Sequence, residues 1–216
     1  MLQRRIQVMD ITSLKAVLAD LRPKLLPSRF EVAQQSESHT LQIGLRTLKG
    51  LIWLEISWDA EVPRLVEIKP PPKSGSQSTL AKQIQYGLNQ LALTEIKQKG
   101  FERIVKFGFS LRPGEQTKKS LIIELMGRHS NLFLVNQQEK VVTIGRQVRS
   151  HHSRLRPIST GDSYSEPPPL RGIEPKSNEV FSDWKRRLSL IPINLKKALQ
   201  DNYQGISPAL AIQLAG

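Results

Sequence analysis

A run of basic side chains is the first feature of the sequence that can do chemistry. Residues 140–156 contain five lysines and arginines and no acidic residue. Guanidinium groups bind phosphate oxygens through paired, charge-assisted hydrogen bonds. We therefore predict phosphate contacts in this segment, and the alternative is a solvated basic strand end that discourages edge pairing. The predicted contacts are Arg146, Arg149, Arg154 and Arg156.

The stretch "GFERIVKFGFS" reads as a strand that begins with an acidic and a basic residue, Glu102 and Arg103. The simplest interpretation is a solvated strand end whose two side chains point to opposite faces. In the alternative, Arg103 binds a phosphate or a guanine edge, and Glu102 accepts hydrogen bonds from base amino groups. The pair would then select where a nucleic acid lies.

Two turns carry further candidate residues. The first joins two apolar strands, and its glycine permits an unusual backbone conformation, so we expect a mainly architectural role. It consists of Gly127, Arg128, His129, Ser130 and Asn131. The second turn, "QGISP", contains Gly205 and Ser207. It can present backbone N–H groups to a phosphate at a helix N-terminus, as in a helix-hairpin-helix hairpin, or it can be an ordinary turn between helices.

Several classes of catalytic and metal chemistry are excluded. The chain has no cysteine, which rules out disulfides, zinc ribbons and thiol catalysis. The adjacent His151 and His152 would point to opposite faces of a strand, and Ser130 next to His129 lacks a nearby acid to orient the imidazole. No phosphate-binding loop or dinucleotide motif is present. We expect no metal, no cofactor, no small-molecule substrate and no catalytic residues.

Hydrophobic periodicity predicts the elements that position these residues. Asp10 is an N-cap for a helix that Pro23 should end. Four alternating strands follow between residues 30 and 69, and a second helix begins near Leu80 and extends to Gly100. Four more strands lie between residues 103 and 148. We predict an α+β fold in which two antiparallel four-stranded sheets pack as a sandwich with two helices.

The carboxyl-terminal part changes in composition. A first domain is expected over residues 1–160, a proline-rich linker over 161–177, and a helical segment over 178–216. The helical segment reads as a truncated helix-hairpin-helix, since its last helical pattern stops at residue 216.

The net charge of +13, with a pI of about 10.2, favours a polyanionic partner such as nucleic acid or the ribosome. No apolar run reaches the roughly 20 residues that span a bilayer. The amino terminus also lacks the apolar region of a secretory signal. We expect a cytoplasmic protein without membrane contact.

Four stretches together resemble the amino-terminal part of the NFACT family, which includes RqcH-type proteins once labelled fibronectin-binding proteins. They are "RRIQVMDITSLKAVLADL", "GFERIVKFGF", "LIIELMGRHSNLFLVN" and "GISPALAIQLA". The resemblance implies a first domain similar to the amino-terminal domain of formamidopyrimidine-DNA glycosylases, followed by a helix-hairpin-helix region. It also implies that Asp10, Glu102 and Arg103 read tRNA, with Glu102 standing where the family usually has Asp.

The function implied by the resemblance is that of a binding factor in ribosome quality control. Such a factor binds the large ribosomal subunit with a stalled peptidyl-tRNA and recruits alanyl-tRNA for alanine tailing, while the ribosome performs peptidyl transfer. Two alternatives remain. A glycosylase would use an amino-terminal proline followed by an acid, but this chain begins "MLQRR". A surface adhesin would need export.

Overall fold

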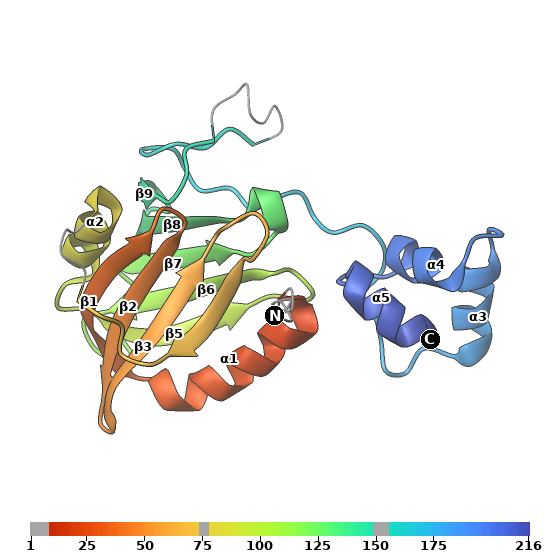
Figure 1. The fold of residues 1–216 in the computed structure, drawn as a ribbon, viewed down its shortest axis with the longest axis horizontal. Helices are drawn as coiled ribbons and strands as arrows, with labels where there is room; N and C mark the ends of the chain where they lie inside the picture. The colour runs from red at the N-terminus through yellow and green to blue at the C-terminus, as the bar shows by residue number, and fades with distance from the viewer. Residues whose placement is uncertain (1–8, 74–77, 149–155) are drawn as a thin grey trace, which may run out of the picture.

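The computed structural model describes residues 9–73, 78–148 and 156–216 (Figure 1). The first elements are α1 (Ile11–Leu25), β1 (Ser28–Glu37), β2 (Thr40–Thr47), β3 (Gly50–Ser57), β4 (Arg64–Ile68) and α2 (Thr79–Leu88). They are followed by β5 (Ala92–Gln98), β6 (Ile104–Ser110), β7 (Lys119–Glu124), the 3-10 helix η1 (Gly127–His129), β8 (Asn131–Asn136) and β9 (Val141–Ile144). The last elements are α3 (Phe181–Ser189), α4 (Leu195–Asn202) and α5 (Pro208–Ala215). The α+β class is confirmed, and no helix in the described ranges is long and apolar enough to cross a membrane.

Helix α1 begins at its predicted cap, because the Asp10 side chain accepts a hydrogen bond from the N–H of Ser13. Pro23 does not end the helix, which continues to Leu25. A proline this close to the carboxyl end removes only one intrahelical hydrogen bond. One face of α1 is buried in the core, through Ile11, Leu14, Leu18, Leu21 and Leu25.

The strands form one antiparallel sheet in the order β4-β3-β2-β1-β5-β6-β7-β8-β9. The prediction of two separate four-stranded sheets is therefore wrong. The missed strand, β5, joins the two halves: it pairs with β1 at Ser28↔Leu93 and Arg29↔Ala92, and it pairs with β6 from Ala92 to Gln98.

The position of β5 was hidden by apolar residues at helical spacing from Leu80 to Leu91, which predicted a helix as far as Gly100. Helix α2 instead ends at Leu88. Gln90 then adopts a left-handed conformation with φ of 64°, which the chain uses to turn from helix into strand. In β5 the residues Leu93 and Ile96 are buried, and the alternation is interrupted between Leu93 and Glu95, where the register shifts.

Both halves of the sheet contribute to one core. The rings of Phe30 in β1 and Phe109 in β6 meet edge to face with centroids 6.3 Å apart. In Figure 1 the orange strands β2 and β3 lie in front of the green strands β7 and β8. Buried side chains of these four strands belong to the same hydrophobic cluster. One face of each half of the sheet is therefore buried in a shared core, although the sheet is continuous.

Helix α2 links β1 to the edge strand β9. The side chain of Gln85 accepts from the N–H of Ala33 at 2.7 Å and donates to the carbonyl of Glu31 at 3.1 Å. Thr143 of β9 donates to the side chain of Gln83. The two Gln85 bonds satisfy backbone groups of β1 where its pairing is irregular.

Residues 156–166, here called the strap, run along β9 on the face of the sheet opposite the main core. The N–H of Val141 donates to the carbonyl of Asp162 at 2.9 Å, and Ile158 forms a bridge with Val148. A second hydrophobic cluster lies beneath the strap, made of Ile122, Phe133, Val135, Val141, Ile144 and Ile158. The first residues of the predicted linker therefore pack on the sheet.

Residues 170–216, here called the helical unit, contain α3, α4 and α5 around a small core of Leu188, Ala198, Leu199 and Tyr203. Ile173 forms a parallel bridge with Tyr203. Gly172, with φ of +85°, sits where a Cβ would come within 2.6 Å of the carbonyl oxygen of Asn202. The short segment before α3 is thus part of this unit.

The prediction of a helix-hairpin-helix segment is wrong, because the described residues of the carboxyl-terminal part form three short helices instead of that element. A hairpin glycine of that element would be open to a phosphate. Here the turn at Gly205 is covered, since a Cβ at this position would lie 3.0 Å from side-chain atoms of both Ile11 and Phe101.

Candidate nucleic-acid interface

One end of the sheet carries most of the predicted site residues. The strand register places Ile104 opposite Glu124, and Glu124 opposite Asn131. The carbonyl of Arg103 accepts from the N–H of Leu125 at 2.9 Å. The acidic and basic pair before β6 and the predicted motif turn between β7 and β8 therefore lie together.

Asp10, the N-cap of α1, lies at the same end of the sheet. Its Oδ1 accepts from the N–H of Ser13 at 2.9 Å and from the hydroxyl of Thr12 at 2.8 Å. Its Oδ2 accepts from the hydroxyl of Ser207 at 3.5 Å. Burial acts to raise the pKa of Asp10, but these hydrogen bonds outweigh burial and hold the pKa below its usual value. Asp10 is a carboxylate anion at neutral pH.

Arg103 lies beside Asp10. Its Nη1 donates to the carbonyl of Met9 at 3.3 Å. Burial lowers the pKa of Arg103, and the charges of Asp10 and Glu102 oppose this shift. Within the described residues Arg103 forms no ion pair, so most donors of its planar guanidinium remain available for a ligand.

Glu102 faces a different partner. Its Oε1 accepts from the backbone N–H of Leu170 at 3.1 Å, and its carbonyl accepts from Gln98 Nε2 at 2.8 Å. Glu102 and Arg103 thus diverge from adjacent positions, one toward the start of the helical unit and the other toward the start of α1. The structure brings Asp10, Glu102 and Arg103 into one charged cluster.

The motif turn is built around Gly127, whose φ is +57°. The N–H of Ser130 donates to the carbonyl of Gly127 at 2.8 Å, and the Ser130 hydroxyl accepts from the N–H of Met126 at 2.8 Å. Arg128 and His129 are exposed and bond to each other at 3.2 Å. The buried Ser130 hydroxyl stabilises the turn by accepting this hydrogen bond, which supports the architectural interpretation.

Asn131 and Arg146 lock the turn to the end of β9. The Asn131 side chain donates to the carbonyl of Arg146 at 2.8 Å and accepts from its N–H at 2.9 Å. The Arg146 guanidinium donates to the carbonyl of Arg128 at 2.6 Å and also reaches that of Ser130 at 3.4 Å. Arg146 therefore holds the turn, and it lies at the edge of the proposed phosphate patch.

Arg156 is engaged with a buried acid. Its Nη1 and Nη2 donate to the two carboxylate oxygens of Glu124 at 2.9 and 2.7 Å, and the Tyr164 hydroxyl donates to Glu124 at 2.8 Å. Burial and the Glu124 charge raise the pKa of Tyr164. The predicted phosphate contact at Arg156 is not supported, because this guanidinium fastens the strap. Arg149 and Arg154, with His151 and His152, lie outside the described residues.

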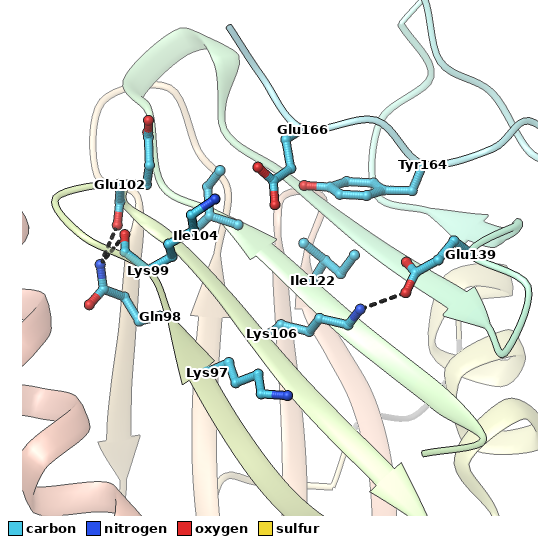
Figure 2. Close-up of a pocket in the computed structure, with 10 residues that line it drawn as sticks. All are labelled: Lys97, Gln98, Lys99, Glu102, Ile104, Lys106, Ile122, Glu139, Tyr164 and Glu166. Carbon is cyan, nitrogen blue, oxygen red and sulfur yellow. Dashed lines mark hydrogen bonds and ion pairs between the residues drawn. The ribbon is translucent and has the colours of Figure 1, made fainter. Parts of the chain in front are cut away.

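A pocket of about 400 Å³ opens between the strap and the outer face of the sheet (Figure 2). Ile104 and Ile122 form an apolar floor, and Tyr164 stands over it. The charged residues around it carry both signs, and two of them pair with each other, Lys106 and Glu139, at 2.7 Å. The pocket therefore lacks the uniform positive charge of a polyanion site. Across the described residues, no group of three acidic or histidine side chains is arranged to hold a metal ion.

Sequence reasoning missed two partners in the charged cluster, the Met9 carbonyl and Ser207. Ser207 caps α5, as Asp10 caps α1. Each residue has the signature of an N-cap. Nothing in the sequence indicates that two caps 197 positions apart lie in contact.

The fold and the site define an α+β domain that places one guanidinium beside two carboxylates at the end of an antiparallel sheet. The chain belongs to the NFACT family, since the family's NFACT N-terminal and middle domains match residues 10–216.

Relatives and solved structures agree with this assignment. The chain is 30% identical over 191 residues to the "Rqc2 homolog RqcH" of Streptococcus suis, covering 86% of this chain and 32% of that protein. It is 32% identical over 122 residues to the "Rqc2 homolog RqcH" of Bacillus subtilis, covering 55% and 21%. The chain thus spans a third or less of the length of these curated relatives.

Two solved structures share the fold. The N-terminal domain of the fibronectin-binding protein PavA of Streptococcus pneumoniae superposes with a TM-score of 0.80 at 23% identity, covering 95% of this chain and 82% of the other. The N-terminal part of the fibronectin/fibrinogen-binding protein of Streptococcus suis gives a TM-score of 0.80 at 25% identity, covering 96% and 78%.

Proposed function

We propose that this chain is the tRNA-recognition part of an RqcH-type ribosome quality control factor. The complete factor binds the large ribosomal subunit carrying a stalled peptidyl-tRNA and recruits alanyl-tRNA for alanine tailing. The ribosome carries out peptidyl transfer, so the factor acts in the cytoplasm as a binding protein. Membership of the NFACT family and the RqcH relatives support this proposal.

The observation that carries the proposal is the position of Arg103 beside Asp10 and Glu102. A half-buried guanidinium that forms no ion pair in the described part of the chain can bind a phosphate or a guanine edge with two parallel hydrogen bonds. The flanking carboxylates accept from base amino groups and repel phosphates that approach in other positions. Arg149 and Arg154 are proposed as additional phosphate contacts, with Arg146 at the edge of the same patch.

The test uses the full-length protein with Arg103→Ala and Arg103→Lys substitutions, purified in its ribosome complexes. Loss of the contact should cost about 1 to 3 kcal/mol of binding free energy, which empties the complexes of tRNA while ribosome association remains. Arg103→Lys should restore little, because an ammonium lacks the planar fork. Arg186→Ala, which removes an exposed arginine of α3, is the control. Normal amounts of tRNA with Arg103→Ala would overturn the assignment.

A second candidate function is fibronectin binding, favoured by the names of the two structural relatives. Immobilised fibronectin and the purified chain test it directly. Saturable binding that the Arg103→Ala substitution leaves unchanged would support this candidate.

A further inference from the structure

The helical unit touches the rest of the protein at the residues that are proposed to contact tRNA. The N–H of Leu170 donates to Glu102, and the hydroxyl of Ser207 donates to Asp10. Within the described residues, these are the two hydrogen bonds that join residues 170–216 to residues 9–148. Figure 1 shows the helical unit beyond the amino-terminal end of α1, connected to the strap by extended chain.

The apolar part of this contact is also small. Gly205 approaches Ile11 and Phe101 so closely that a Cβ would lie 3.0 Å from each side chain. The other close approach is polar, since a Cβ at Gly100 would lie 3.1 Å from Oε1 of Glu174. A contact made of so few residues is weaker than an ordinary domain interface, and units joined in this way commonly move relative to each other.

The docked unit restricts access to the site. Asp10 is only 6% exposed: one carboxylate oxygen serves Thr12 and Ser13, and the other is covered by Ser207. The Oε1 atom of Glu102 is likewise occupied by Leu170. Release of these two contacts would uncover the Asp10 carboxylate and would free the Oε1 atom of Glu102 as a further acceptor for base amino groups.

We propose that docking of the helical unit and binding of tRNA compete for Asp10 and Glu102. The helical unit is then an intramolecular competitor, and the undocked form is the one that binds. The measured dissociation constant equals the intrinsic constant divided by the undocked fraction. This inference rests on the proposed function of the cluster.

Two substitutions weaken docking without altering either carboxylate. Leu170→Pro removes the N–H that Glu102 accepts, and Leu170→Ala is its control because it keeps that N–H. Ser207→Gly removes the hydroxyl but retains an acceptable N-cap residue, and Ser207→Thr is its control because it keeps the hydroxyl.

Two fluorophores report the docked state. The chain has no native cysteine, so Tyr86→Cys on α2 and Lys185→Cys on α3, both exposed, carry a donor and an acceptor dye at defined positions. Energy transfer is measured with and without deacylated tRNA, and the dissociation constant is measured for each variant.

Saturating tRNA should lower energy transfer in the unsubstituted chain. The Leu170→Pro, Ser207→Gly double variant should show low transfer without tRNA and bind tRNA about threefold to tenfold more tightly, because it no longer breaks two docking bonds. The two controls should behave as the unsubstituted chain.

Other results overturn the competition. Undocking in the double variant with unchanged or weaker tRNA binding would show that the helical unit does not compete. Energy transfer that stays constant as tRNA binds would do the same. No tRNA binding by any variant, with transfer still lowered by the substitutions, would instead overturn the proposed function and leave only the docking contacts.

Discussion

The carboxylate of Glu124 is completely buried under the strap and accepts hydrogen bonds from both terminal nitrogens of Arg156. The Tyr164 hydroxyl donates to the same carboxylate, and the guanidinium lies 5.5 Å from the centre of the Phe133 ring. The ion pair therefore joins the strap to the outer face of the sheet, where an open basic patch was expected from composition.

Arg156→Ala should destabilise the fold strongly, because it leaves the Glu124 charge buried without its cation. Breaking such a pair costs about 3 to 5 kcal/mol, to be measured by urea unfolding. Lys106→Ala is the matched control, since Lys106 and Glu139 form an exposed pair worth about 1 kcal/mol or less. Equal, small losses in both variants would contradict the structural role of Arg156.

Gly127→Ala should reduce the free energy of unfolding by about 1 kcal/mol or more, because φ of +57° disfavours a residue with a Cβ. The nearest atom to that Cβ, the carbonyl oxygen of Ala60, is 3.7 Å away, so the cost comes from the backbone and not from a clash. Gly127→Asn should recover part of the loss, since asparagine tolerates this conformation. Equal unfolding midpoints for the unsubstituted chain and the Gly127→Ala variant would show that this position does not need a glycine.

Asp10 should contribute a pH-dependent part of the stability. Because its folded-state pKa lies below the usual value, its contribution is present above the unfolded pKa of about 3.9 and is lost as the pH falls through the folded pKa. Asp10→Asn keeps an N-cap but removes the charge. Its stability deficit at pH 7 should shrink as the pH falls below about 4, and a deficit independent of pH would argue against this shift.

The Arg149→Ala and Arg154→Ala double variant should bind all tRNAs more weakly and should lower the slope of log affinity against log salt by about one for each lost phosphate contact. Arg112→Ala, an exposed arginine just beyond the other end of β6, serves as the control. A double variant with the slope of the unsubstituted chain would remove these residues from the interface.

The local elements were predictable because their signals are local. Asp10 begins a helix through a bond to a residue three positions away, and alternating apolar residues identify eight of the strands. The ninth, β5, was not predictable, because the left-handed Gln90 interrupts an apolar spacing that continues to look helical. The joining of the halves depends on two residue pairs between β1 and β5, which leave no pattern in the sequence.

The candidate site was selected in part by resemblance. The family resemblance singles out Asp10, Glu102 and Arg103, but their proximity depends on the strand register and on the start of α1. Arg156 shows the opposite case: it is 32 residues from Glu124, and a count of basic residues cannot distinguish a buried ion pair from a free phosphate ligand.

The bridge between Ile173 and Tyr203, with Gly172 against Asn202, has a consequence for how the protein can be divided. A fragment that starts at Asn178, where composition alone puts the boundary, would lack the segment that covers the turn between α4 and α5. It would expose the backbone of Asn202 and Gln204, which now bond to Ile173 at 2.9 Å each. An autonomous version of the helical unit should therefore begin no later than Leu170, and truncation between these two positions should convert a folding module into a protease-sensitive peptide.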